Sequence, residues 1–120
     1  MDRSIHDVER LDGRTAVVTL RRGAGHELGI EVARLLATLE ADGVSRFIVD
    51  IRTPLLLNSK VLDALVRAAA HLDPRTGAGL AVITEQQYVR TILEVTETGG
   101  LLFLADSREE ALEALPPARA

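Results

Sequence analysis

Hydrophobic residues along the chain follow two alternating patterns, one typical of buried strands and one typical of amphipathic helices. Short β-branched or apolar runs at 15–20, 46–51, 80–83 and 101–104 predict strands. Residues 46–72 show the change between the two patterns most clearly. After the apolar run at 47–51, apolar residues recur at three- and four-residue steps, which places them on one face of a helix. These positions are Val61, Leu62, Leu65, Val66, Ala69 and Leu72.

The segments around this centre predict the remaining elements. Residues 4–11 are of mixed polarity and predict a weak first strand at a sheet edge, and Asp12-Gly13 predicts a type I′ hairpin turn to the next strand. Residues 27–41 predict a helix that ends at Asp42-Gly43, because glycine suits the left-handed position after a helix. A shorter helix is expected from Thr84 or Glu85 up to Thr96.

A final helix is predicted after 101–104. Ser107 and Glu110 have the spacing of a capping box, and Pro116-Pro117 stops the helix. The resulting order is β-β-α-β-α-β-α-β-α. Such alternation predicts an α/β fold with a mixed, mainly parallel sheet, because right-handed crossovers bring successive strands side by side. With 120 residues, the chain is expected to be one domain spanning 1–120, with its core at 4–115 and a short tail at 116–120.

Composition narrows the class of protein. Aromatic residues make up only 2% of the chain, so Leu, Val, Ile and Ala must fill the core. The net charge of -4 argues against a general nucleic-acid binder, which usually has a basic face. The absence of cysteine excludes disulfides, zinc–thiolate sites and thiol catalysis. No apolar run reaches the roughly 18 residues of a membrane span, and the opening residues do not resemble a signal peptide, so a cytoplasmic protein is expected.

Few residues suggest catalysis, and neither an enzyme nor a cofactor is expected. His6, His26 and His71 lie far apart, and no two of them have the spacing of metal ligands. Gly23 and Gly25 begin a phosphate-binding pattern, but Leu28 takes the place of its third glycine. The loop at 21–25 is therefore interpreted as a connection.

The polar residues that flank the central helix are better candidates for binding. Asp50 ends a strand, where open α/β sheets place ligand groups, although a role in capping a loop is simpler. Asn58 is a good N-cap for the helix that follows. Ser59 then lies in the first turn, where free N–H groups and the helix dipole favour a negative charge such as a phosphate.

Taken together, these residues resemble the central motif of the STAS domain, a family named after sulfate transporters and anti-sigma factor antagonists. The family's usual form is Asp-Leu-Ser-x-x-x-Φ-Φ-Asp-Ser-Ser-Gly-Leu-x-x-Leu, where Φ is apolar. The likeness continues at Val89, Ile92, Leu93 and Thr96 and at Asp106-Ser107, so that it spans 15–115. The central positions that match are Asp50, Ile51, Leu56, Leu57, Ser59, Leu62 and Leu65.

The resemblance implies a binding module of the anti-sigma factor antagonist type. Such a protein binds an anti-sigma factor of serine-kinase type, and phosphorylation by that kinase at the position of Ser59 reverses the binding. An alternative is a divergent STAS scaffold that is not phosphorylated; an enzyme is the least favoured class. Loops at the carboxyl ends of strands are the usual binding surface of α/β sheets. The expected partner-binding residues are Asp50, Asn58, Ser59, Lys60, Arg21 and Arg22.

Three departures from the family motif affect the expected switch. Asn58 replaces an Asp, Lys60 replaces the second Ser, and Val61 replaces the Gly. Lys60 would neutralise part of the charge of a phosphate on Ser59, and Asn58 lacks the like charge that would add to it. Phosphorylation, if it occurs, is therefore predicted to repel a partner less strongly than in the usual motif.

Overall fold

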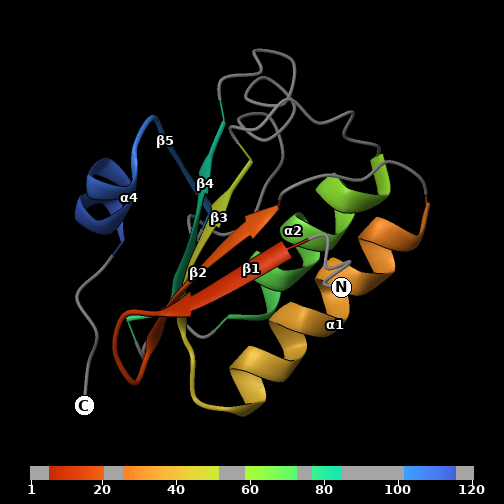
Figure 1. Cartoon of the computed structure of the whole chain (residues 1–120), viewed down its shortest axis with the longest axis horizontal. Helices are drawn as coiled ribbons and strands as arrows, with labels where there is room; N and C mark the ends of the chain where they lie inside the picture. Colours follow the sequence, from red (N-terminus) through yellow and green to blue (C-terminus); the bar gives the residue numbers. More distant parts are fainter. Residues whose placement is uncertain (1–5, 21–25, 52–58, 73–76, 85–101, 116–120) are drawn as a thin grey trace.

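A five-stranded sheet lies between helices on its two faces in the computed structural model, which describes residues 6–20, 26–51, 59–72, 77–84 and 102–115 (Figure 1). Its strand order is the order of the chain. The first pair is antiparallel and the other three pairs are parallel, which confirms the mixed, mainly parallel α/β sheet. The strands are β1 (His6–Arg10), β2 (Thr15–Leu20), β3 (Arg46–Asp50), β4 (Gly79–Ile83) and β5 (Leu102–Ala105); the helices are α1 (His26–Ala41), α2 (Ser59–His71) and α4 (Arg108–Ala114).

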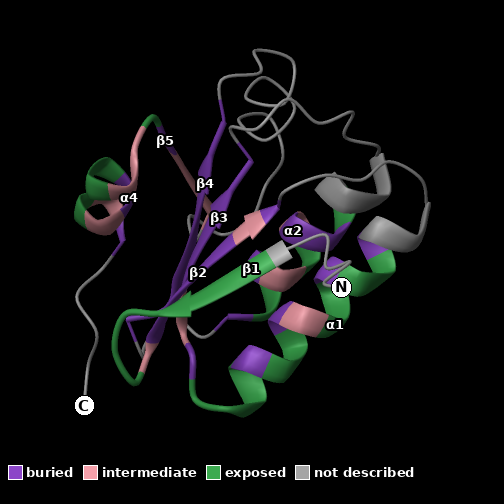
Figure 2. Ribbon diagram, viewed as in Figure 1, coloured by how far each residue is buried: buried purple, intermediate pink, exposed green. Residues whose placement is uncertain are grey.

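The two faces of the sheet carry separate hydrophobic clusters. Helices α1 and α2 pack on one face against Phe47, Val49 and their neighbours. Helix α4 covers the other face, where Ala111 and Leu115 pack with Ile48. Successive residues of β3 point to opposite faces, so both sets are buried. This explains the continuous apolar run at 47–49, and Figure 2 shows the central strands buried along their length.

Helix α2 confirms the predicted apolar face where its side chains are described. Leu65, Ala69 and Leu72 are buried and Val66 is half-buried. Ala64 is buried as well, although it was not among the positions predicted for this face. The side chains at 59–62 are outside the description, as are Asn58 and residues 85–96 of the next expected helix.

The end of α1 has the predicted glycine conformation. Gly43 has a φ of 99°, its N–H donates to the carbonyl of Glu40 at 3.0 Å, and the Val44 N–H donates to Leu39 at 3.0 Å. These two bonds are those of a Schellman motif, in which orphan carbonyls at a helix end are satisfied. Val44 and Leu39 are both buried, so the motif also turns the chain back toward the sheet.

The first hairpin forms as predicted, but its turn is different. The strands β1 and β2 pair from His6 opposite Leu20 to Arg10 opposite Ala16, and residues 11–14 form the loop. A type I′ turn needs positive φ at Asp12 and Gly13, whereas in the described residues only Gly43 and Gly77 have it, so that prediction is wrong. The Asp12 Oδ1 instead accepts hydrogen bonds from the N–H groups of Arg14 and Thr15, both at 2.8 Å.

This loop predicts a small stability effect that depends on pH. The N–H of Arg14, and then the hydroxyl and N–H of Thr15, hold the pKa of Asp12 below its usual value. The carboxylate therefore stabilises the fold above the unfolded-state pKa of about 3.9, and this contribution is lost as the pH falls through the lower, folded-state pKa. We expect Asp12→Ala to lower the free energy of unfolding by about 0.5–1 kcal/mol at pH 7, with the difference shrinking below about pH 4.

Urea unfolding at neutral and acidic pH measures this effect. Asp12→Asn is the matched control, because it keeps an acceptor oxygen and removes the charge that titrates. It should keep more of the stability at pH 7 than Asp12→Ala does. A difference between Asp12→Ala and the parent that is the same at both pH values would contradict a role for the ionised carboxylate.

The last helix begins at the predicted cap. Ser107 has extended backbone angles, and its Oγ accepts a hydrogen bond from the Glu110 N–H at 3.1 Å. Arg108, in the first turn of α4, reaches Glu9 of β1 at 3.3 Å. The final helix is thereby tied to the first strand.

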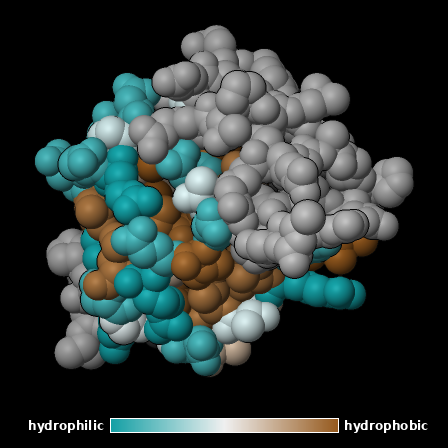
Figure 3. All heavy atoms as spheres, in the orientation of Figure 1, coloured by the Kyte–Doolittle hydropathy of each residue, from teal (hydrophilic) through white to brown (hydrophobic). Residues whose placement is uncertain are grey.

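Figure 3 shows the molecular surface in the orientation of Figure 1, with hydrophilic residues mostly on one side and hydrophobic residues gathered toward the middle.

Candidate functional site at the carboxyl edge of the sheet

The sheet brings several of the predicted binding positions to one edge. Strand β3 ends at Asp50, which lies in register with Thr19 of β2 and Ile83 of β4. These parallel strands all end at the same side of the sheet. Helix α2 begins at Ser59, directly after the loop that leaves β3. The strand that carries Asp50 and the helix that carries Ser59 are thus joined by a single connection at this edge.

Buried polar side chains mark the same edge. Asp50 is only 6% exposed, and Thr84 directly follows β4 and is fully buried. The Ile51 N–H donates to the carbonyl of Ile83 at 2.8 Å, so the pairing of β3 and β4 continues up to this point. Both polar residues have interaction partners, so the carboxylate of Asp50 is fixed by other groups of the protein.

Thr84 belongs to this edge although the sequence analysis did not single it out as a site residue. It lies opposite Ile51 if the register of Asp50 with Ile83 is carried on by one residue. The sequence feature that could have identified Thr84 is its position, since it is the first polar residue after the apolar run of β4. By contrast, Thr15 lies at the other end of β2, where its Oγ1 accepts a hydrogen bond from Arg46 at 2.9 Å.

The start of α2 is suited to an anion. The helix has 13 residues, and its first turn contains Ser59 and Lys60 but no acidic residue. Unpaired N–H groups and the positive end of the helix dipole favour negative charge at such a terminus. The backbone of Ser59 and Lys60 is placed in this turn, their side chains are outside the description, and Asn58, Arg21 and Arg22 lie outside the described residues altogether.

The described residues contain neither a metal-binding cluster nor a membrane-spanning helix. They contain no group of three or more His, Asp or Glu side chains that could hold a metal ion. None of their helices is long and apolar enough to cross a membrane.

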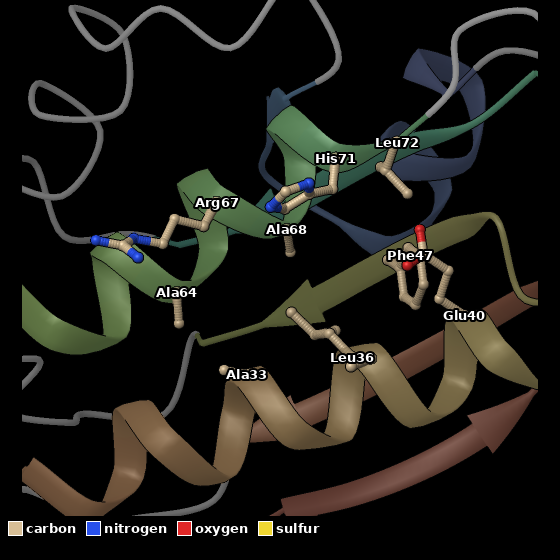
Figure 4. Close-up of a pocket in the computed structure, with 10 residues that line it drawn as sticks. Ala33, Leu36, Glu40, Phe47, Ala64, Arg67, Ala68, His71 and Leu72 are labelled. Atoms are coloured by element: carbon tan, nitrogen blue, oxygen red, sulfur yellow. The ribbon is translucent and has the colours of Figure 1, made fainter.

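An apolar hollow among the described residues lies away from this edge. It is a groove of about 180 Å³ between α1 and α2, with Leu36 and Phe47 at its floor (Figure 4). None of the predicted binding residues lines it. The carboxyl edge and the groove are therefore separate surfaces, and the anion-favouring helix terminus belongs to the first.

This chain is similar to known proteins in its three-dimensional structure. The sequence matches no protein-family model and no curated protein sequence. An anti-sigma factor antagonist from Mycobacterium paratuberculosis superposes with a TM-score of 0.72 at 20% identity, over 92% of each chain. The chain has the fold of the anti-sigma factor antagonists.

Two structures of SpoIIAA agree with this STAS-like fold. The anti-sigma factor antagonist SpoIIAA in its unphosphorylated form has a TM-score of 0.69 at 17% identity, over 90% of this chain and 93% of that one. The Bacillus cell fate determinant SpoIIAA in the phosphorylated form has a TM-score of 0.57 at 16% identity, over 90% and 96% of the two chains. The fold predicted by the resemblance to STAS domains is thereby confirmed.

Proposed function

We propose that this protein is a binding module of the anti-sigma factor antagonist type, which engages an anti-sigma factor of serine-kinase type. The observation that carries the proposal is a fold shared over 92% of the chain with such an antagonist. The position of Ser59 at the start of α2 adds to it, since this is the serine that the motif resemblance selects. Binding alone requires no catalytic residues on this chain.

The partner is expected to contact the carboxyl edge of the sheet. Loops at this side are where α/β sheets usually bind, and the edge joins the end of β3 to the start of α2. Buried Asp50 would hold the connection in place from below, whereas residues of the two loops would make the contacts. The residues assigned to this surface are Asp50, Asn58, Ser59, Lys60, Arg21 and Arg22.

Phosphorylation of Ser59 is the proposed off-switch. SpoIIAA, whose fold this chain shares, exists in unphosphorylated and phosphorylated forms. In this chain a phosphate on Ser59 would meet the free N–H groups of the first turn and the positive charge of Lys60. The fold would tolerate the modification, while a partner seated on the same turn would face about 1.5–2 added negative charges.

A second candidate is a scaffold of the same fold that is not phosphorylated. It is favoured by Asn58, Lys60 and Val61, which replace the Asp, Ser and Gly of the usual motif. Both candidates bind a protein at the same edge. They differ in whether a kinase can modify Ser59.

Charge reversal tests the proposed surface. Isothermal titration of the chain with a kinase-type anti-sigma factor of the same organism gives the Kd. We expect Lys60→Glu to change this Kd by about tenfold, because it reverses a charge inside the contact. Glu113→Lys is the control, since Glu113 is exposed on α4, which covers the other face of the sheet, and should change the Kd less than about twofold. Equal effects of the two variants would remove the carboxyl edge from consideration.

A further inference from the structure

Small side chains line the two sides of the groove between α1 and α2. Ala33 of α1 faces Ala64 and Ala68 of α2 across it, and Phe47 of β3 lies below (Figure 4). Ala37 of α1 also lines the groove. Because alanine extends only one carbon from the backbone, the two helices leave apolar surface open between them. The remaining lining residues are Leu36, Glu40, Arg67, His71 and Leu72.

The size of the groove favours a protein surface over a metabolite. Ligand pockets usually have about 300–1,000 Å³, and this groove has about 180 Å³. Its apolar surface continues on α1 to Ile30, three residues before Ala33, which is 54% exposed and is the most exposed large hydrophobic residue of the described chain. Apolar surface therefore extends along the helix layer beyond the hollow itself.

Charges of opposite sign border the groove. Glu40 lies on the α1 side at the level of His71 on the α2 side, and Arg67 lies one turn earlier on α2 (Figure 4). Arg67 also pairs with Asp63 at 2.8 Å, on the outer surface of α2. Along the groove itself, the α1 side is acidic and the α2 side is basic.

We propose that this helix layer is an interface with a second copy of the same chain. A two-fold axis running along the groove places α1 of each copy over α2 of the other. Because such an axis keeps positions along the groove unchanged, Glu40 then faces His71 of the second copy, and the alanines of the two copies meet, which lets the helices approach closely. A two-fold axis across the groove would instead place α2 against α2 and bring like charges together, which is unfavourable.

The available area sets the expected strength. Helix α1 has 16 residues and α2 has 13, so at 1.5 Å per residue they are about 24 and 20 Å long. With two helices side by side at about 10 Å, the layer offers about 450 Å² per copy, or about 900 Å² in total. Specific interfaces begin near 1,000 Å², so we expect a weak, reversible dimer.

The dimer does not depend on the proposed function. None of the residues assigned to the carboxyl edge lines the groove, whose lining on α2 begins at Ala64, so the two proposals make separate predictions even though both surfaces include part of α2. A failure of one proposal therefore leaves the other unchanged.

Sedimentation of the purified whole chain at about 5–500 μM tests the proposal. We expect the weight-average mass to rise from 13.0 kDa toward twice that value. Ala37→Glu should raise the dimer Kd at least tenfold, because it introduces a charge among the apolar residues that line the groove. Thr38→Glu is the matched control: it adds the same charge to an exposed position of α1 that does not line the groove, and should leave the Kd within about twofold.

A charge swap tests the orientation of the two copies. Glu40→Arg and His71→Glu should each weaken the dimer, and the double variant should recover most of the affinity, because opposite charges then face each other again. A chain that stays at the monomer mass at every concentration would overturn the proposal. So would a dimer that Ala37→Glu leaves intact, since the copies would then meet through another surface.

Discussion

Leu65→Asp should unfold the protein at room temperature. Leu65 is fully buried in the middle of α2, within the cluster that joins both helices to the sheet. An aspartate there would place a carboxylate among apolar side chains without a charged partner, and such burial costs several kcal/mol. A domain of this size is stable by about 5–15 kcal/mol, so the substitution removes much or all of the margin.

Circular dichroism and thermal melting measure the result. Ala70→Asp is the matched control, because Ala70 is exposed on the same helix and the substitution brings the same side chain. This variant should melt within a few degrees of the parent, since surface substitutions usually change stability by less than about 0.5 kcal/mol. A Leu65→Asp variant that melts like the parent would show that the assigned face of α2 is wrong.

Phosphorylation of Ser59 should abolish most of the binding to an anti-sigma factor of serine-kinase type. Incubation with that kinase and ATP is expected to add one phosphate to Ser59, which mass spectrometry locates. The modified chain should bind at least about a hundredfold more weakly, because two negative charges enter the proposed interface. Ser59→Ala should fold normally, resist labelling and stay bound in the presence of ATP. Ser59→Asp adds a single charge without the geometry of a phosphate, and should imitate the modified form only weakly.

A substitution of Lys60 tests whether this residue weakens the effect of the phosphate. Lys60 can pair with a phosphate on Ser59, so Lys60→Ser in the phosphorylated chain should weaken binding further than phosphorylation of the parent does. Equal binding of the two phosphorylated proteins would show that Lys60 does not damp the switch. Phosphate absent from Ser59, or present on another hydroxyl such as Thr53, would support the scaffold that is not phosphorylated.

The elements that sequence predicts best are those with strong local signals. The apolar run of β3, the glycine after α1 and the cap at Ser107 each specify their own conformation, and all three are confirmed. The prediction of a type I′ turn after β1 was wrong because the sequence Asp12-Gly13 is compatible with more than one loop conformation. Its geometry is decided by the Asp12 side chain, which accepts two backbone N–H groups and so stabilises a longer loop.

The two surfaces differ in how far sequence could predict them. The carboxyl edge follows from strand order, since β3 must end near the helix that comes next, and this places Asp50 and Ser59 on the same side. The groove depends on the distance between α1 and α2. Within each helix, residues such as Ala33 and Ala68 are ordinary helix formers, and only their packing across two helices shows the space that they leave.

The agreement of strand order with chain order has a consequence for synthesis on the ribosome. Each new strand can pair with the one made just before it, so the sheet can grow from β1 toward β5 as the polypeptide emerges. The residues packed under α4 lack the cover of this helix until the end of synthesis, because α4 is the last of the described elements to be made. Nascent chains that stop before Arg108 would expose Val17, Ile48 and Ala81 to water, and are expected to recruit chaperones or to aggregate.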